Sequence, residues 1–298
     1  MVSDPGRSND APRDVIIVHL SDLHFGGFAD LRQIVALEEF LPSLSPTALV
    51  VSGDLTQRAR HGEFQAAHVF LHRMRLKVPA LIVPGNHDVE WWKSPFSLLG
   101  EKRKYAKYLL YYGELRPQLE VPGAIIAGAV SGYGVALGSL TWNLRDLAVK
   151  GHLPRSETNR VKKVFAQAPA ELARVLVVHH NVLAGGTGRM GLARWRSAHK
   201  RLLDTGADVI LCGHDHFEGA GQIEGGLAVS TSGTHSYRQR GGRPSVFNLV
   251  TLDHQSVHIQ HFRWVSGDRQ FIPSDKFSFA RKGAPKVAVS IAGGDQGL

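Results

Sequence analysis

Short apolar runs alternate with amphipathic segments along most of the chain. Apolar runs rich in Val, Ile and Leu are typical of buried strands, and apolar residues three or four positions apart are typical of helices. The predicted strands are Val15–Leu20, Ala48–Val51, Ala80–Val83, Ala124–Val130, Val175–Val178, Val209–Leu211 and Leu227–Ser230. The predicted helices are Leu31–Leu41, Glu63–Arg75, Phe96–Tyr112, Ser156–Gln167 and Trp195–Asp204. This alternation predicts an α/β fold.

The C-terminal part of the pattern is richer in strands. The runs SVFNLVTLD and QSVHIQHFRWV predict a hairpin that turns at Asp253 and His254. Residues 14–273 are expected to form one domain. Residues 1–13 are expected to be a disordered leader and residues 274–298 a flexible tail, because both are poor in periodic apolar positions.

Five of the predicted strands end in the same kind of polar residue. The clusters are Asp22-x-His24, Gly53-Asp54, Gly85-Asn86-His87-Asp88, His179-His180-Asn181 and Gly213-His214-Asp215-His216. Ligand sites of α/β sheets lie beyond the carboxyl ends of the strands. Taken alone, each cluster could be a capped turn at the end of a strand. The repetition predicts that the five clusters converge on one site.

The spacing within these clusters suggests how two side chains reach one place. Along extended backbone, side chains two positions apart point to the same side. We therefore expect Asp22 and His24 to form one ligand pair, and His214 and His216 another. The glycines before Asp54, Asn86 and His214 are expected to permit sharp turns and close backbone approach.

Imidazole, carboxylate and amide groups together are typical of metal sites. Imidazole suits zinc, iron and manganese, and oxygen ligands favour harder ions. The set exceeds what one four-coordinate ion needs. It predicts two ions about 3.5–4 Å apart that share a carboxylate, an arrangement that serves phosphoryl chemistry.

Composition narrows the class of protein further. The 298 residues carry a formal charge of +9, which favours an anionic partner such as a phosphoester. The single cysteine, Cys212, excludes an intramolecular disulfide framework. No apolar run suggests a signal peptide or a membrane span. We expect a cytoplasmic protein.

The five clusters, in this order, resemble the pattern of the calcineurin-like metallophosphoesterase superfamily over about residues 15–265. The stretches HLSDLHFG, VVSGDLTQRA and PGNHDV are similar to its bacterial cyclic-nucleotide phosphodiesterase branch. The resemblance implies a four-layer αββα sandwich of two mixed β-sheets flanked by helices. It also implies a cofactor of two metal ions, for which we expect iron and manganese, with zinc as the alternative.

The resemblance also implies which residues hold the two ions. The first set is Asp22, His24, Asp54 and His216. The second set is Asp54, Asn86, His179 and His214, so that Asp54 bridges both ions. Either His179 or His180 could ligate by residue type. We assign His179, because the ligand of the family directly follows the strand.

The implied reaction is attack of a metal-held hydroxide on phosphorus, with His87 as the acid that protonates the leaving alkoxide. Asn86, His87 and Arg58 are expected to contact the substrate. Asp88 is expected either to support the ligands or to cap a helix. The related Ser/Thr phosphatases carry an acid where this chain has Gln57, which disfavours phosphoprotein phosphatase activity. A small-molecule phosphodiester, such as a 3′,5′-cyclic nucleotide, is therefore the expected substrate.

One segment and the total charge suggest other functions. Residues 90–115 combine aromatic residues with Lys102-Arg103-Lys104 and predict a cap or insertion that buries its apolar face, in this chain or in a homodimer. The alternative is a wall for a lipid-linked phosphoester or pyrophosphate, with peripheral membrane contact. A nuclease is disfavoured because no long basic stripe is present. A non-catalytic metal-binding scaffold is disfavoured because no ligand is missing.

Overall fold

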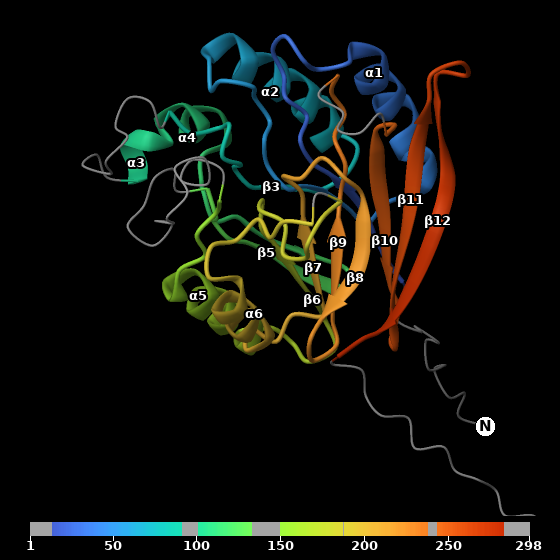
Figure 1. The fold of residues 1–298 in the computed structure, drawn as a ribbon. Helices are drawn as coiled ribbons and strands as arrows, with labels where there is room; N and C mark the ends of the chain where they lie inside the picture. Colours follow the sequence, from blue (N-terminus) through green and yellow to red (C-terminus); the bar gives the residue numbers. More distant parts are fainter. Residues whose placement is uncertain (1–13, 91–100, 133–149, 187, 238–242, 283–298) are drawn as a thin grey trace, which may run out of the picture.

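We describe the fold from a computed structural model. It describes residues 14–90, 101–132, 150–186, 188–237 and 243–282, and the predicted leader of residues 1–13 lies outside them. The described part forms two β-sheets with helices on their outer faces (Figure 1).

The first sheet has the strand order β12-β11-β10-β1-β2-β3. Strand β1 pairs in parallel with β2 and β2 with β3, and the other pairs are antiparallel. The strands are β1 (Val15–Leu20), β2 (Ala48–Val51), β3 (Ala80–Ile82), β10 (Val246–Leu252), β11 (Ser256–Val265) and β12 (Gln270–Ala280).

The second sheet has the order β4-β5-β6-β7-β9-β8, and its inner four strands run parallel. The outermost strands β4 and β8 pair antiparallel with their neighbours. The strands are β4 (Gln118–Val121), β5 (Ala124–Gly128), β6 (Ala173–Val177), β7 (Val209–Cys212), β8 (Gly219–Ile223) and β9 (Leu227–Thr231). Both sheets are therefore mixed.

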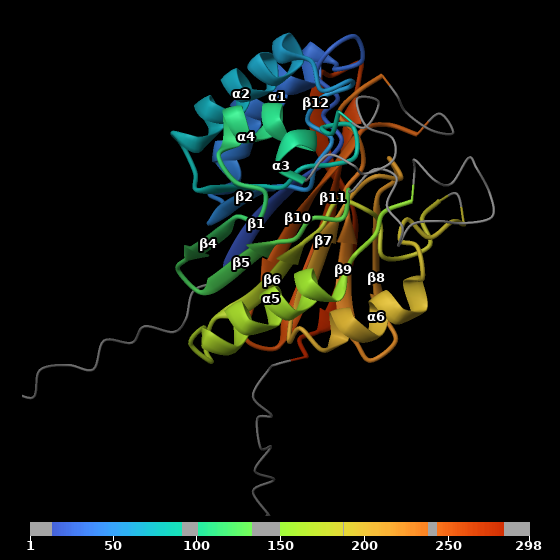
Figure 2. The same cartoon turned by 90° about the vertical axis from the view of Figure 1, so that its left-hand side faces the viewer.

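The helices cover the outer faces of the two sheets. Helices α1, α2 and α4 lie on the side of the first sheet, and α5 and α6 lie side by side on the second (Figure 2). The helices are α1 (Leu31–Phe40), α2 (His61–Arg75), α3 (Glu101–Lys104), α4 (Ala106–Tyr112), α5 (Arg155–Gln167) and α6 (Trp195–Leu203), and a 3₁₀ turn spans Leu41–Leu44.

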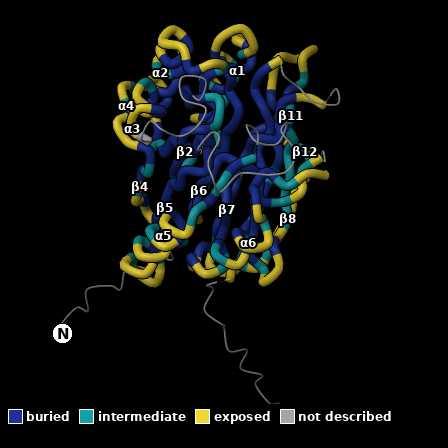
Figure 3. Tube along the Cα trace, turned by 60° about the vertical axis from the view of Figure 1, so that its left-hand side comes forward, coloured by how far each residue is buried: buried dark blue, intermediate teal, exposed yellow. Residues whose placement is uncertain are grey.

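Three apolar clusters separate these layers. Side chains alternate along β1, so Ile17 faces the cluster between the sheets and Val18 faces the cluster under α1 and α2. The third cluster, which includes Val161 and Phe165, lies between the second sheet and helices α5 and α6. The inner strands are largely buried, whereas β12 and the outer sides of the helices are exposed (Figure 3). This arrangement confirms the predicted four-layer αββα sandwich.

The sequence pattern located most of the elements but missed three strands. The predicted hairpin is present as β10 and β11, while β4, β8 and β12 were not predicted. The expectation of a flexible tail from residue 274 is wrong for residues 274–280, which belong to β12 and pair with β11. Strand β12 lies at a sheet edge and includes Pro273 and many exposed polar residues, so it lacks a clear apolar alternation. Residues 283–298 lie outside the described part.

Within its described residues, the aromatic segment forms two short helices rather than one long one. Tyr105 and Tyr108 are fully buried, and the Tyr108 hydroxyl donates to the carbonyl oxygen of Ile82 at 2.9 Å. The ring of Tyr111 stacks on Phe64 of α2 at 5.5 Å. Residues 91–100 of the predicted cap lie outside the described residues. The described part of the segment therefore buries its aromatic face within this chain.

In the parts of the chain that the structure describes, no helix combines the length and the apolar character needed to cross a membrane.

Candidate metal centre

The site lies where the carboxyl ends of strands from both sheets meet. Strands β1, β2 and β3 of the first sheet are followed by Asp22 and His24, by Asp54, and by Asn86 and His87. Strands β6 and β7 of the second sheet are followed by His179 and by His214 and His216. The structure therefore brings together residues separated by up to 192 positions along the chain, as His24 and His216 are.

The backbone at the ligand pairs is left-handed rather than extended. The φ angles are +53° at Asp22, +47° at His24, +53° at Asp54, +76° at His214 and +59° at His216. The expectation that extended backbone aims these pairs at one place is therefore wrong. Left-handed backbone is uncommon for residues other than glycine, although Asp and His adopt it more readily than most. Sharp local turns, not strand alternation, bring Asp22 and His24 into one donor group and direct His214 and His216 into different groups.

Hydrogen bonds between the loops hold these turns in place. The N–H of Asp22 donates to the Gly53 carbonyl at 3.0 Å, and the N–H of His24 donates to the Asp54 carbonyl at 3.0 Å. The loops after β1 and β2 therefore continue side by side beyond the sheet. Each loop carries one of the site's carboxylates.

The glycines permit close approach, as the sequence predicts. A Cβ at Gly85 would lie 2.1 Å from Oδ1 of Asp54, and one at Gly213 would lie 1.8 Å from Oγ of Ser21. Gly53 also has a φ of +97°. A side chain at any of these three positions would therefore displace a residue of the site.

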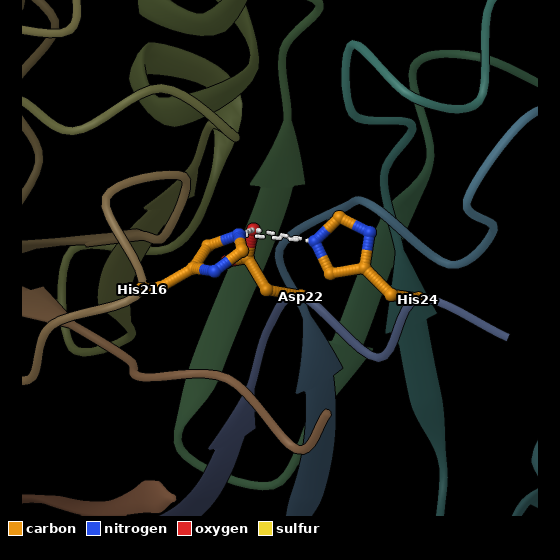
Figure 4. A group of neighbouring side chains, drawn as sticks. All are labelled: Asp22, His24 and His216. Carbon is orange, nitrogen blue, oxygen red and sulfur yellow. Dashed lines mark hydrogen bonds and ion pairs between the residues drawn. The ribbon is translucent and has the colours of Figure 1, made fainter. Parts of the chain in front are cut away.

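Asp22, His24 and His216 form the first group of donors (Figure 4). Their donor atoms face one another: Nε2 of His24 lies 3.0 Å from Nε2 of His216 and 3.7 Å from Oδ1 of Asp22. The same Asp22 oxygen lies 3.3 Å from Nε2 of His216. Neighbouring nitrogen ligands about 2.1 Å from a zinc-like ion lie roughly 3.0–3.4 Å apart, so the group has the size of a coordination shell.

Asp54, His179, His214 and Asn86 form the second group. Oδ1 of Asn86 lies 3.0 Å from Nε2 of His179 and 2.9 Å from Nδ1 of His214. The two imidazole nitrogens are 3.3 Å apart. Oδ1 of Asp54 lies 3.3 Å from Nε2 of His179.

Asp54 lies between the two groups. Its Oδ2 atom is 3.8 Å from Nε2 of His24 in the first group, while Oδ1 faces His179 in the second. Oδ1 also accepts a hydrogen bond from the N–H of His87 at 2.8 Å, which fixes the orientation of the carboxylate. One carboxylate with an oxygen toward each donor group is the geometry of a bridging ligand.

His179 and His180 have different surroundings. Nδ1 of His179 lies 2.8 Å from the carbonyl oxygen of Ser52, so Nε2 of its ring is turned toward Asp54. Nδ1 of His180 lies 2.9 Å from the hydroxyl of Ser131 instead. The structure thus places His179 among the donors and His180 behind them, while the metal-ligand role of His179 stays a prediction.

His87 lies beside the first group, and one of its ring nitrogens lies within 4.8 Å of donor atoms of His24 and Asp54. Its ring contacts His24 edge-on at 4.9 Å, and its Nδ1 lies 2.8 Å from the carbonyl oxygen of Gln57. The Nδ1–H group of His87 donates to this carbonyl, so Nε2 is the nitrogen available for a substrate. The predicted acid is therefore oriented by a backbone group.

Arg58 differs from the other predicted site residues. It is exposed, and its N–H donates to Oε2 of Glu63 at 2.7 Å. Within the described residues, no contact joins its guanidinium to the donor groups. Its predicted contact with substrate stays a prediction.

Asp88 ties together two loops of the site, a role that the sequence left open. Its Oδ2 atom accepts from the N–H groups of Leu55 at 3.1 Å and Gly85 at 2.9 Å. Its Oδ1 atom accepts from the N–H and the hydroxyl of Thr56, each at 2.9 Å. Burial, together with the charge of Asp54, raises the pKa of Asp88 to about 6. The carboxylate therefore positions the loops that carry Asp54 and Asn86.

The charges of the site fit bound cations. Asp22 and Asp54 are buried, and Oδ1 of Asp22 has no hydrogen-bond partner among the described residues. Burial opposes ionisation, but His216 and His24 lower the pKa of Asp22 well below its usual value. Burial opposes protonation of His179, but the charge of Asp54 raises its pKa to about 9. Buried carboxylates without a full set of partners are costly unless positive charge compensates them. The donor set therefore fits two metal ions, one in each group.

The chain is similar to known phosphoesterases. The profile of the calcineurin-like phosphoesterase family matches residues 16–218. Over 221 residues the chain is 26% identical to the glycerophosphodiester phosphodiesterase GpdQ of Enterobacter lignolyticus (strain SCF1), which covers 68% of this chain and 71% of that protein.

Solved structures share the fold. The yellow lupin purple acid phosphatase PPD1 superposes with a TM-score of 0.65 at 12% identity, covering 90% of this chain and 54% of that one. The chain thus spans about half the length of the lupin enzyme. A dimetal phosphatase from Danio rerio superposes with a TM-score of 0.62 at 10% identity, covering 90% of this chain and 99% of that one.

These likenesses and the paired donor groups identify a metal-dependent phosphoester hydrolase. Since the family profile covers more than half of the sequence, the chain belongs to the calcineurin-like phosphoesterase family.

Proposed function

We propose that the protein hydrolyses a small phosphodiester at a dinuclear metal centre. The observation that carries this proposal is the position of Asp54, whose two carboxylate oxygens face two separate groups of donors. Asp22, His24 and His216 would hold one ion, and Asn86, His179 and His214 the other. When bound, such a pair of ions activates water and neutralises charge on the phosphoryl oxygens.

The residues of the chain would supply the remaining steps. Asp88 and the interloop hydrogen bonds keep the two donor groups in register. Nδ1–H of His87 donates to the carbonyl of Gln57, so that Nε2 of His87, when protonated, can donate a proton to the leaving alkoxide. The half-exposed position of Asn86 and His87 gives the substrate access to an otherwise buried site.

Two features support a diester over a monoester. The relative in Enterobacter lignolyticus is named a glycerophosphodiester phosphodiesterase. In addition, His87 is paired with a neutral carbonyl and not with the carboxylate that the Ser/Thr phosphatases would place at Gln57. Glycerophosphodiesters and 3′,5′-cyclic nucleotides are both candidate substrates, and each releases an alkoxide that needs an acid.

The lipid-linked alternative has less support. A lipid-facing wall would expose its aromatic face, whereas Tyr105 and Tyr108 are fully buried and Tyr111 stacks on Phe64. For the metal pair we propose iron and manganese, on the basis of the mixed imidazole and oxygen donors.

A metal-reconstituted activity panel tests the proposal. It compares bis-p-nitrophenyl phosphate, p-nitrophenyl phosphate, a glycerophosphodiester, cyclic AMP, a lipid phosphodiester and single-stranded DNA, each with iron, manganese and zinc. We expect diesters of small alcohols to be hydrolysed fastest. Faster turnover of the monoester with every metal would overturn the preference for diesters. Fastest turnover of the lipid phosphodiester or of DNA would show that the substrate is a lipid or a nucleic acid instead.

A further inference from the structure

A second, strongly basic pocket lies between helices α5 and α6. It has a volume of about 210 Å³ and is lined by His152, Pro154, Arg155, Ala193, Arg194 and Arg201. The two helices lie side by side on the outer face of the second sheet (Figure 2). None of the lining residues belongs to the two donor groups of the metal centre.

The three arginines of this pocket have no acidic partner among the residues that the structure describes. Within the described ranges, no ion pair joins Arg155, Arg194 or Arg201 to a carboxylate. This contrasts with Arg116 on the same side of the molecule, which pairs with Glu157 at 2.6 Å. Three guanidinium groups around one small cavity repel one another unless an anion lies between them.

Arg201 is held toward the pocket by the chain itself. Its Nη2 atom donates to the carbonyl oxygen of Leu153 at 2.7 Å, and its Nε atom is buried without a hydrogen-bond partner among the described residues. Burial and the charge of Arg155 lower the pKa of Arg201. Burial and the charges of Arg201 and Arg194 lower the pKa of His152. The positive charges thus act on one another across the cavity.

Two helix N-termini lie at the pocket, although the first turn of α5 also carries the acidic Glu157, which pairs with Arg116. Pro154 and Arg194 are the N-cap residues of α5 and α6, and neither makes a side-chain cap hydrogen bond. First-turn N–H groups of a helix attract anions. Arg194 also has a φ of +51°, a strained conformation for arginine. The backbone is therefore strained at Arg194, the residue where α6 begins.

The pocket is close to the metal centre. The N–H of Gly151 donates to the Gly191 carbonyl and that of Ala193 to the Gly151 carbonyl, each at 2.8 Å. A Cβ at Gly151 would lie 2.3 Å from the His180 ring, and that ring contacts His214 at 4.4 Å. One layer of side chains therefore separates the pocket from the second donor group.

We propose that this pocket is an anion-binding site that takes a phosphate or carboxylate group held by Arg155, Arg194 and Arg201. Its volume is below the roughly 300 Å³ at which pockets for drug-sized ligands begin, so it suits a single anionic group rather than a nucleoside. The group has two sources: a second anionic group of the substrate, or free inorganic phosphate. The evidence for this site is the cavity and the arginines that line it, and this evidence does not depend on the substrate class proposed above.

The first experiment measures phosphate binding to the full chain loaded with metal. Calorimetry compares the wild type with Arg155→Gln/Arg194→Gln, whose arginines are both exposed. The control Lys162→Gln/Lys200→Gln removes two exposed charges from the same helices outside the pocket. We expect two phosphate sites per chain in the wild type and the control. One of them should weaken at least tenfold in the arginine variant, with unchanged metal content.

The second experiment separates the two sources of the anion. It compares glyceryl p-nitrophenyl phosphate with the same diester in which a carboxylate replaces the primary alcohol. If the substrate supplies the anion, the arginine variant raises KM at least tenfold for the carboxylate diester alone, with similar kcat. If free phosphate is the ligand, both diesters behave alike in every variant while the second phosphate site is still lost.

One result overturns the proposal. If the arginine variant keeps the same number and affinity of phosphate sites as the lysine control, and the two diesters keep the same KM ratio, the pocket is not an anion site. Thermal unfolding of each variant checks that it is folded.

Discussion

Nδ1 of the His87 imidazole lies 2.8 Å from the backbone carbonyl oxygen of Gln57. A main-chain oxygen therefore orients the expected acid of the reaction, at the position where the Ser/Thr phosphatases are expected to use a carboxylate side chain. The carbonyl fixes the ring without adding a negative charge next to the metal centre. His87 can then be tested separately from the residues that are expected to hold the ions.

His87→Ala should slow the reaction without loss of metal. Loss of a positioned acid typically costs about 10²–10⁴-fold in rate. The loss should be large for an alkyl diester such as a glycerophosphodiester and small for an aryl diester, because p-nitrophenolate leaves without a proton. Rates on both substrates and metal content are measured, with His61→Ala as the exposed control. Equal losses on both substrates would assign His87 to phosphate binding, and loss of an ion would place it among the ligands.

Asp54→Ala should remove the bridge between the two donor groups. Because the two oxygens of Asp54 face His24 and His179, we expect loss of at least one ion per chain and of most of the activity. Metal analysis by mass spectrometry and turnover of bis-p-nitrophenyl phosphate check this, with the exposed Asp268→Ala as control. A variant with both ions and near-normal turnover would contradict the dinuclear assignment.

Asp88→Asn should loosen the loops of the site. An amide nitrogen cannot accept the hydrogen bonds that one carboxylate oxygen now takes from Leu55 and Gly85 or from Thr56. Unsatisfied buried groups cost about 1–3 kcal/mol, so the free energy of unfolding should fall by that amount. Metal affinity should fall with it, whereas the exposed Asp204→Asn should change neither. Unchanged stability and metal affinity would show that the contacts of Asp88 are dispensable.

The stability of the metal-free protein should fall in acid because of His19. Burial lowers the pKa of His19 to about 3, from an ordinary value of 6.5. Between these values the unfolded state binds the extra proton, so this contribution is complete above pH 6.5 and is lost as the pH falls toward 3. The slope per proton is about 1.4 kcal/mol per pH unit.

Chemical denaturation between pH 4 and pH 8 compares the wild type with His19→Gln and with the exposed control His254→Gln. His19→Gln should reduce the slope of the unfolding free energy against pH by up to about 1.4 kcal/mol per pH unit, which corresponds to one proton. The control should leave the slope unchanged. An unchanged slope in His19→Gln would assign the acid sensitivity to other buried histidines.

The donor residues could be predicted from the sequence because the side chains of Asp, Asn and His are themselves the groups that can bind a metal ion. Asp, Asn and His at five strand ends predicted the place where the strands of both sheets meet, and the structure brings the predicted donors together there. The choice of His179 over His180 depended on which residue directly follows the strand, and the structure gives the two rings different partners.

Other features of the fold and the site could not be predicted from a single sequence. The contribution of Gln57 comes from its carbonyl group, which every residue has. The left-handed turns at Asp22 and His214 depend on contacts with distant loops. Arg155 of the basic pocket is far from Arg194 and Arg201 in the sequence and meets them only because α5 and α6 pack side by side. Strand β12 is exposed at a sheet edge, so no apolar alternation reveals it.

Because the backbone at the ligand pairs is left-handed, selection for stability and selection for activity favour different residues at these positions. Such strained conformations cost of order 1–3 kcal/mol each, and glycine would relieve that strain. At Asp22, His24, Asp54, His214 and His216, however, glycine would also delete a donor atom. A population evolved only for heat resistance, without a demand for catalysis, should therefore discard these residues early. Selection for metal binding would instead keep all five of them.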